Sequence, residues 1–91
     1  MPQFLVESYA VKSASAFRNA CALARKTAEI DERIRYVDTT YLPGDETALH
    51  LFDAPCVDEL DRAARRAGLQ FERIVQAVND LSDKRREIED A

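Results

Sequence analysis

The sequence predicts a single α+β domain of the ferredoxin-like βαββαβ type, with a four-stranded antiparallel sheet and two helices on one of its faces. Two observations carry this prediction. Strand and helix patterns follow one another along the 91 residues in the order strand, helix, strand, strand, helix, strand. A single strong turn, Pro43-Gly44-Asp45, joins the two middle strands into a hairpin, so each helix serves as a crossover between strands.

The first half of the chain supplies a strand, a helix and a hairpin. Residues 3–9 alternate at their end and favour a strand. Ser13 or Ser15 can cap the helix that follows, over residues 16–30, where alanines and larger apolar residues recur at helical spacing. Residues 34–42 are β-branched and aromatic, and residues 46–52 form the returning strand of the hairpin.

The second half supplies the other helix and the last strand. Pro55 suits the first turn of a helix, Asp58 and Glu59 complement its dipole, and Gly68 suits its end. Residues 71–78 favour a strand, although a helix is the alternative there. We expect the ordered domain to span residues 1–80 and a charged tail to span residues 81–91.

Composition excludes several classes of protein. Hydrophobic residues make up 46% of the chain, which is too many for a disordered protein. Thirteen basic residues against 17 acidic ones give a net charge of −4, which disfavours binding to nucleic acid. The chain has no 18-residue apolar run, and we expect neither a secretory signal nor a disulfide framework from its two cysteines. We expect a cytoplasmic protein that does not bind membranes.

The predicted fold leaves one sheet face uncovered, and a second copy of the chain is the simplest cover for it. We therefore expect a homodimer that packs through its sheet faces. If the hairpin closes at Pro43-Gly44, Leu42 pairs with Asp45. The register then sets Val37 opposite His50, Thr39 opposite Ala48 and Arg35 opposite Phe52.

Alternation along the strands then distributes side chains between the two faces. Leu49, Leu51, Phe4 and Val6 are expected to face the helices. The uncovered face is expected to carry the candidate site residues His50, Glu7, Thr39, Arg35 and Phe52. An imidazole beside a carboxylate suits an acid/base pair or a pair of metal ligands in a small enclosed cavity.

Structural roles compete with these functional ones. His50 can be a hydrogen-bonded strand residue, Glu7 can be an ion-pair partner, and Thr39 can be a strand former. Cys21 is expected to be a packing residue. Cys56 lies near a helix start, where a thiol pKa can fall, but the sequence shows no base beside it.

Four stretches of the sequence resemble the small bacterial nickel-binding-protein-like family of largely uncharacterised domains, and the likeness extends to about Val78. The stretches are Phe4-Leu5-Val6-Glu7, Arg35-Tyr36-Val37-Asp38-Thr39, Leu51-Phe52-Asp53-Ala54-Pro55 and Ala63-Ala64-Arg65-Arg66-Ala67-Gly68-Leu69. The resemblance implies a ferredoxin-like fold, a homodimer packed through its sheet faces and, in at least one member, nickel binding.

This chain departs from the family at two positions that bear on a metal. Family members commonly carry a histidine before the Ala-Arg-Arg-Ala-Gly run, where this chain has Ala63, and a cysteine on the third strand, where it has His50. His50 and Glu7 could still hold a divalent metal such as nickel, since imidazole and carboxylate suit such ions. Two ligands per chain make a weak site unless the partner or a cysteine adds more.

Two functions remain open from the sequence. The favoured one is a homodimeric binding protein that holds a metal ion or small ligand in the cavity between the sheets. The alternative is a cofactor-free isomerase or monooxygenase resembling the dimeric α/β-barrel enzymes. There His50 would be the acid/base, Glu7 would orient it, and Arg35 or Thr39 would fix the substrate. The third strand and the net charge exclude an RNA-recognition module, and the loop after the first strand lacks the thiols of a copper chaperone.

Overall fold

A computed structural model describes residues 1–78 of the chain and confirms the predicted element order. The predicted tail at residues 81–91 lies outside the described residues. The elements are β1 (Gln3–Ser8), α1 (Ala14–Ile30), β2 (Arg35–Leu42), the 3₁₀ turn η1 (Pro43–Asp45), β3 (Thr47–Asp53), α2 (Val57–Ala67) and β4 (Arg73–Ala77).

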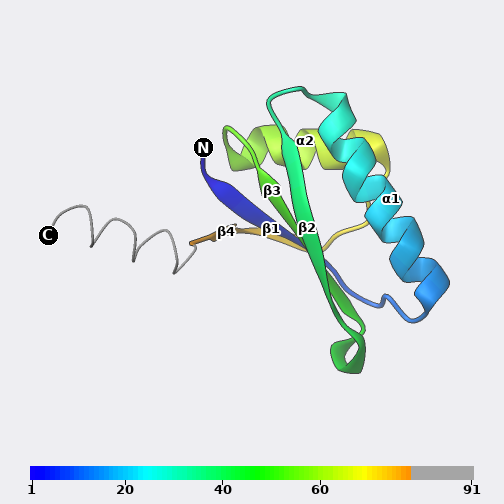
Figure 1. Cartoon of the computed structure of the whole chain (residues 1–91). Coiled ribbons are helices and arrows are strands. Elements are labelled where there is room, and N and C mark those ends of the chain that lie inside the picture. The colour runs from blue at the N-terminus through cyan, green and yellow to red at the C-terminus, as the bar shows by residue number, and fades with distance from the viewer. Residues whose placement is uncertain (79–91) are drawn as a thin grey trace, which may run out of the picture.

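The four strands form one antiparallel sheet in the order β2-β3-β1-β4, as the ferredoxin-like fold requires. Both helices lie on the same side of this sheet (Figure 1). Within residues 1–78, the opposite face is left without a covering layer. No described helix is long and apolar enough to cross a membrane.

Local capping explains where the helices begin and end. The Oγ of Ser13 accepts a hydrogen bond from the backbone N–H of Ala16 at 3.0 Å, which starts α1 at Ala14, two residues before the predicted position. Helix α2 begins at Val57, with Cys56 as its N-cap, and therefore later than Pro55. It ends at Gly68, which adopts a left-handed conformation with φ of 85°.

The core lies between the sheet and the two helices. Phe4 and Val6 of β1 and Phe52 of β3 pack against Leu60 of α2, and all four side chains are buried. Small residues complete this layer where the helices approach the sheet, namely Ala24, Ala54, Ala63 and Ala64. The small side chains allow close approach of the helices, so a thin domain still forms a continuous apolar core.

The predicted hairpin register is wrong by two residues. The 3₁₀ turn takes up Pro43–Asp45 and Glu46 follows in the left-handed region, so Leu42 pairs with Thr47 instead of Asp45. Thr39 consequently lies opposite His50 instead of Ala48. The pairing then shifts by one residue between Tyr36 and Asp38, which is a β-bulge at Val37. Beyond the bulge, Arg35 pairs with Asp53 instead of Phe52.

The end of α2 supplies a stability prediction. We expect Gly68→Ala to lower the free energy of unfolding by about 1 kcal/mol, because an added Cβ disfavours a φ of 85° while meeting no neighbouring atom within 4 Å. Gly44→Ala is the matched control, since a Cβ there also meets nothing within 4 Å and Gly44 has no positive φ. Urea unfolding of both variants measures the difference, and equal losses would contradict the capping role.

Candidate functional site

His50 is buried on the helix side of the sheet, and its predicted place on the uncovered face is wrong. It pairs with Val6 of β1, and Phe52 on the same strand pairs with Phe4. Residues directly opposite in a sheet share a face, so His50 and Phe52 face the helices with Val6 and Phe4. Phe52 is fully buried in the core and cannot contact a ligand between sheets. Leu49 and Leu51 therefore occupy the uncovered face instead.

The bulge at Val37 places the hydroxyl groups of Tyr36 and Thr39 on the same side of the sheet as His50. Tyr36 and Thr39 are three residues apart, and in a regular strand they would face opposite sides of the sheet. Because the bulge inserts one extra residue, Tyr36 pairs with Phe52 and Thr39 pairs with His50, both on the helix side. Their hydroxyl oxygens lie 2.5 Å apart. Thr39 therefore lies beside His50 on the helix side, so its expected place on the uncovered face is wrong, and Tyr36 lies next to it.

A hydrogen-bonded chain crosses the interior through His50. On one side, its Nδ1 lies 2.8 Å from the Oγ1 of Thr39, which in turn meets the hydroxyl of Tyr36. On the other side, its Nε2 lies 3.4 Å from the Oγ of Ser8, a longer contact. Ser8 donates its own proton to the backbone carbonyl of Gln70 at 2.5 Å. Both ring nitrogens of this buried imidazole thus have partners.

When the imidazole is neutral, each hydrogen bond in this row has a fixed donor and a fixed acceptor. The Ser8 hydroxyl has a single proton and gives it to Gln70, so Nε2 must donate to Ser8. Nδ1 is then the acceptor, and Thr39 donates to it. Thr39 has no second proton, so the Tyr36 hydroxyl donates to Thr39. The Tyr36 oxygen therefore offers only its lone pairs to anything outside.

Burial lowers the pKa of His50 to about 4, because the charged imidazolium is poorly solvated there. At neutral pH the ring is uncharged and cannot act as a proton donor in the way a catalytic imidazolium does. The arrangement instead orients two hydroxyl groups.

The Tyr36 end of this chain opens into a cleft of about 420 Å³ between α1 and β2. Tyr36, Asp38 and Thr39 line it from the strand, and the residues that line it from the helix are Phe17, Arg18, Cys21 and Arg25. The guanidinium of Arg25 lies over the ring of Tyr36, 5.7 Å from its centroid. Phe17 also stacks on Tyr41, with ring centroids 4.7 Å apart, so the aromatic rings hold α1 beside the edge strand.

Glu7 lies on the uncovered face, as predicted, and therefore points away from His50. Its register partners are Leu49 of β3 and Arg73 of β4. Its Oε1 is 3.0 Å from the Nε of Arg73 and accepts a hydrogen bond from the Tyr9 hydroxyl at 2.8 Å. The hydrogen bond from Arg73 lowers the pKa of Glu7, and the bond from Tyr9 acts in the same direction. Arg35 also reaches the uncovered side, where its Nε is 3.2 Å from Asp53.

The described residues do not assemble the nickel site that the family resemblance implies. His50 and Glu7 project from opposite faces of the sheet, and both nitrogens of His50 are engaged by hydroxyl groups. In residues 1–78, no three His, Cys, Asp or Glu side chains cluster closely enough to hold a metal ion. The donor set therefore does not fit a divalent metal within one chain.

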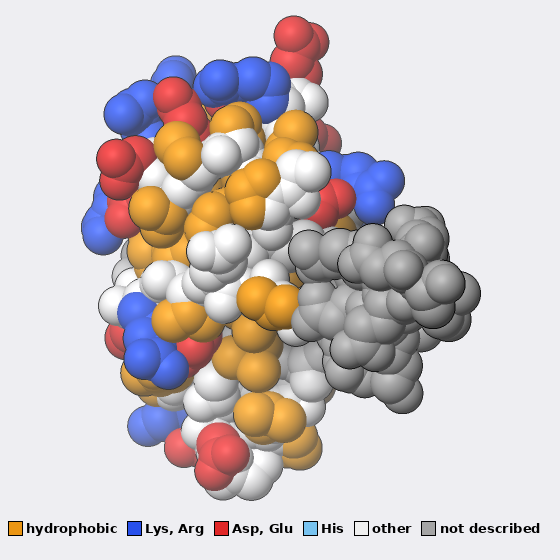
Figure 2. All heavy atoms as spheres, turned by 90° about the vertical axis from the view of Figure 1, so that its left-hand side faces the viewer, with side chains coloured by type: hydrophobic (Ala, Val, Ile, Leu, Met, Phe, Trp, Pro, Cys, Tyr) orange, Lys and Arg blue, Asp and Glu red, His pale blue; other side chains and the backbone are white. Residues whose placement is uncertain are grey.

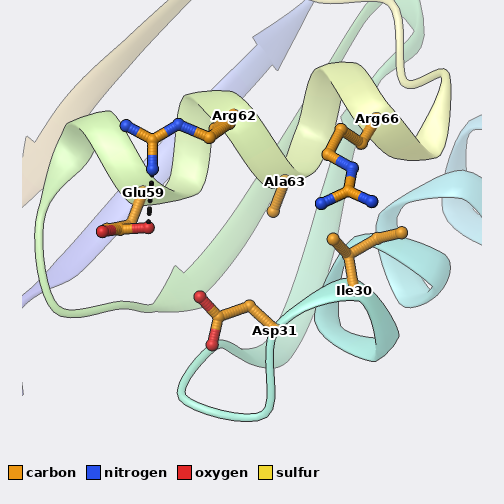
Figure 3. A pocket seen from close by; sticks show the side chains of 6 residues that line it. All are labelled: Ile30, Asp31, Glu59, Arg62, Ala63 and Arg66. Atoms are coloured by element: carbon orange, nitrogen blue, oxygen red, sulfur yellow. Dashed lines mark hydrogen bonds and ion pairs between the residues drawn. The ribbon is translucent and has the colours of Figure 1, made fainter.

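Two arginines of α2, Arg62 and Arg66, line a separate pocket of about 140 Å³ between α2 and the C-terminal end of α1 (Figure 3). Arg62 pairs with Glu59 at 3.2 Å, and Glu59 also pairs with Arg33 at 3.2 Å. Ala63 lies on the wall of this pocket between the two flanking arginines, Arg62 and Arg66. Arg62 therefore belongs to an ion-paired helix surface.

Comparison with known proteins supports the fold alone. No family model matches the chain, and no curated protein matches it. Among solved structures, the chain is similar to SCO4226 from Streptomyces coelicolor A3(2), with a TM-score of 0.69 and 18% sequence identity. The match covers 86% of this chain and 98% of the Streptomyces protein. At this level of identity, the two proteins share the ferredoxin-like arrangement.

Sequence reasoning missed Tyr36 and the two arginines at the cleft, and it missed Arg73 as the partner of Glu7. Arg18 and Arg25 could have been found from their seven-residue spacing, which places them on one side of α1 two turns apart. Tyr36 could not have been found, because no sequence rule locates the bulge. Arg73 was overlooked because its partner strand, β4, joins β1 only in the folded sheet.

The buried imidazole makes stability depend on pH. The folded pKa of about 4 lies below the ordinary histidine pKa of 6.5, so between these values the unfolded chain binds a proton that the folded chain does not. We expect the free energy of unfolding to fall by about 3 kcal/mol as the pH decreases from 6.5 to 4. Urea unfolding at pH 7 and pH 4.5 measures most of this loss.

The proton NMR signal of the imidazole provides a direct check, since the chain has a single histidine. Its chemical shift should stay constant between pH 8 and pH 5. A titration midpoint near pH 6.5 would show that the ring is solvated and would contradict the burial of His50.

Proposed function

We propose that the protein is a homodimeric binding protein that encloses a small polar molecule between the uncovered faces of two sheets. The observation that carries this proposal is the makeup of that face. Half-buried leucines and valine surround a carboxylate that is already oriented by an arginine and a tyrosine. An apolar surface with a few oriented polar groups is the usual makeup of a small-molecule site.

The apolar part of the face is continuous across three strands. Leu5 of β1 pairs with Leu51 of β3 and with Val75 of β4, and Leu49 lies beside this row. Figure 2 shows this side of the molecule, where hydrophobic side chains run through the middle and charged ones gather toward the rim. A surface with an apolar centre and a charged rim favours association with another protein surface.

A second copy of the chain fits this surface better than an unrelated partner. Strand spacing and rise give the face dimensions of roughly 19 by 23 Å. Packing two such faces together would bury about 900 Å² if both were flat, and protruding side chains add to this area. Specific interfaces bury more than ~1,000 Å². The ion pairs Glu7–Arg73 and Arg35–Asp53 lie at opposite ends of the face, so a two-fold axis can place acids beside bases.

Glu7, Tyr9 and Arg73 supply the hydrogen-bonding groups for a ligand in the enclosed space. Both described contacts of the Glu7 carboxylate involve Oε1. Oε2 can therefore accept a hydrogen bond from an N–H or O–H group of a ligand. The Tyr9 hydroxyl and the Arg73 guanidinium add a neighbouring oxygen and further donors. We propose a small organic molecule with hydrogen-bond donors as the ligand, in preference to nickel, because of the donor geometry described above.

The enzymatic alternative receives less support from the geometry. His50 was the expected acid/base, and it is buried, neutral and turned away from the face where Glu7 would orient it. Arg35 is held by Asp53 at the other end of the face.

Self-association is tested by placing a charge in the centre of the face. We expect Leu51→Lys to weaken dimerisation at least about 100-fold, because two lysines would face each other across an apolar contact. Val57→Lys is the control, since Val57 is an exposed valine on α2, in the other layer. Sedimentation velocity measures the mass, and circular dichroism confirms that both variants fold. A monomeric wild-type protein would overturn the proposal.

Ligand binding is tested by native mass spectrometry of protein purified without chelator. We expect the dimer to carry an organic adduct that Glu7→Gln loses, while Asp53→Asn retains it, since Asp53 is a carboxylate at the opposite end of the same face. A dimer without an adduct, or one whose adduct persists in Glu7→Gln, would overturn the binding role and leave the dimer standing. A metal mass that Glu7→Gln removes would replace the organic ligand with an ion.

A further inference from the structure

The cleft between α1 and β2 carries an unusual charge arrangement for this protein. The whole chain has a net charge of −4, yet this cleft is lined by two basic residues, Arg18 and Arg25, and by one acidic residue, Asp38. Among residues 1–78, neither arginine takes part in an ion pair, whereas five other arginines do. The positive charge at this cleft is therefore available to a ligand.

The two arginines can contact two anionic groups at once. They are seven residues apart on α1, which is about two turns or 10 Å along the helix. Their long side chains can converge over the cleft from both ends, and a guanidinium binds a carboxylate through paired hydrogen bonds. The ring of Tyr36 holds Arg25 in place, which reduces the entropy that the side chain loses on binding.

The strand side of the cleft offers acceptors. The hydrogen-bonded chain commits the proton of Tyr36 inward to Thr39, so the Tyr36 oxygen can only accept a hydrogen bond from the cleft. Asp38 adds a carboxylate, which the backbone N–H of Thr39 fixes at 2.8 Å through Oδ1. A hydroxyl lone pair beside a carboxylate suits an ammonium group.

We infer that this cleft binds an acidic amino acid, the class of small molecule that carries two carboxylates and one ammonium group. The two guanidinium groups would bind the carboxylates, and Asp38 with the Tyr36 oxygen would bind the ammonium. The volume of about 420 Å³ is ample for such a molecule. The cleft lies on the helix side of the sheet, so this site is separate from the proposed ligand between the two sheets.

The inference is tested with L-glutamate and glutarate, which differ by one ammonium group. Both are titrated into the full-length ¹⁵N-labelled protein, and NMR shift changes report affinity and location. We expect L-glutamate to shift residues of the cleft and to bind about tenfold more tightly than glutarate, since a charge-assisted hydrogen bond is lost with glutarate.

Three variants separate the roles of the charged groups. Arg25→Gln should weaken both ligands about tenfold, whereas Lys26→Gln, which removes the same charge from the neighbouring position, should leave both unchanged. Asp38→Asn should remove the preference for L-glutamate, and Asp45→Asn in the hairpin turn should preserve it.

Several outcomes would overturn the inference. Equal binding of glutarate and L-glutamate to the wild-type protein would exclude the ammonium contact. Shifts that lie outside the cleft, or no shifts with either ligand, would exclude the site. An equal loss in Lys26→Gln would show that only the general charge of α1 matters. None of these outcomes affects the dimer, which is measured by mass.

Discussion

The extra residue in β2 is the feature on which the polar interior depends. Without the bulge at Val37, Tyr36 and Thr39 would project from opposite faces of the sheet, and the Tyr36 hydroxyl would not reach Thr39. With it, the two oxygens approach to 2.5 Å, and the hydrogen bonds that start at His50 extend through Thr39 to Tyr36. An edge strand tolerates this irregularity because it loses pairing on one side only.

The buried imidazole has a hydrogen-bond partner at each ring nitrogen, so its burial helps to position the surrounding strands. A buried polar group without partners is costly, whereas one whose hydrogen bonds are all made can fix the relative positions of the elements that supply them. Here the partners come from β1, β2 and the segment before β4, so one histidine ties together strands that lie far apart in the sequence. Burial keeps the ring neutral, and the hydrogen bonds make it a positioning group for Thr39 and Tyr36.

The sheet separates two kinds of chemistry. On the helix side, the cleft beside β2 combines two arginines, a carboxylate and an oriented hydroxyl group. On the uncovered side, a carboxylate lies among leucines at the edge of an apolar surface. Because alternate residues of a strand face opposite sides, substitutions at one site leave the other largely unchanged. The similarity to SCO4226 concerns the fold that supports both sides.

The sequence by itself determined the element order, the ferredoxin-like topology and the end of α2 at Gly68, and it located both helix starts to within two residues. These depend on local signals such as Ser13, Gly68 and the spacing of apolar residues, which act within a few residues of one another. It also placed Glu7 on the uncovered face, because β1 alternates cleanly between Phe4 and Val6 on one side and Leu5 and Glu7 on the other.

Only the tertiary structure decided the face of His50 and the register of the hairpin. The leucines of β3 were expected to face the core, but Phe52 fills the space against Leu60 better, and its strand places His50 beside it. The three-residue turn and the bulge each shift the pairing, and their effects appear only when β2 packs against β3. Strand pairing is a non-local interaction, so the sequence fixes which residues could form a site, and packing decides which of them meet.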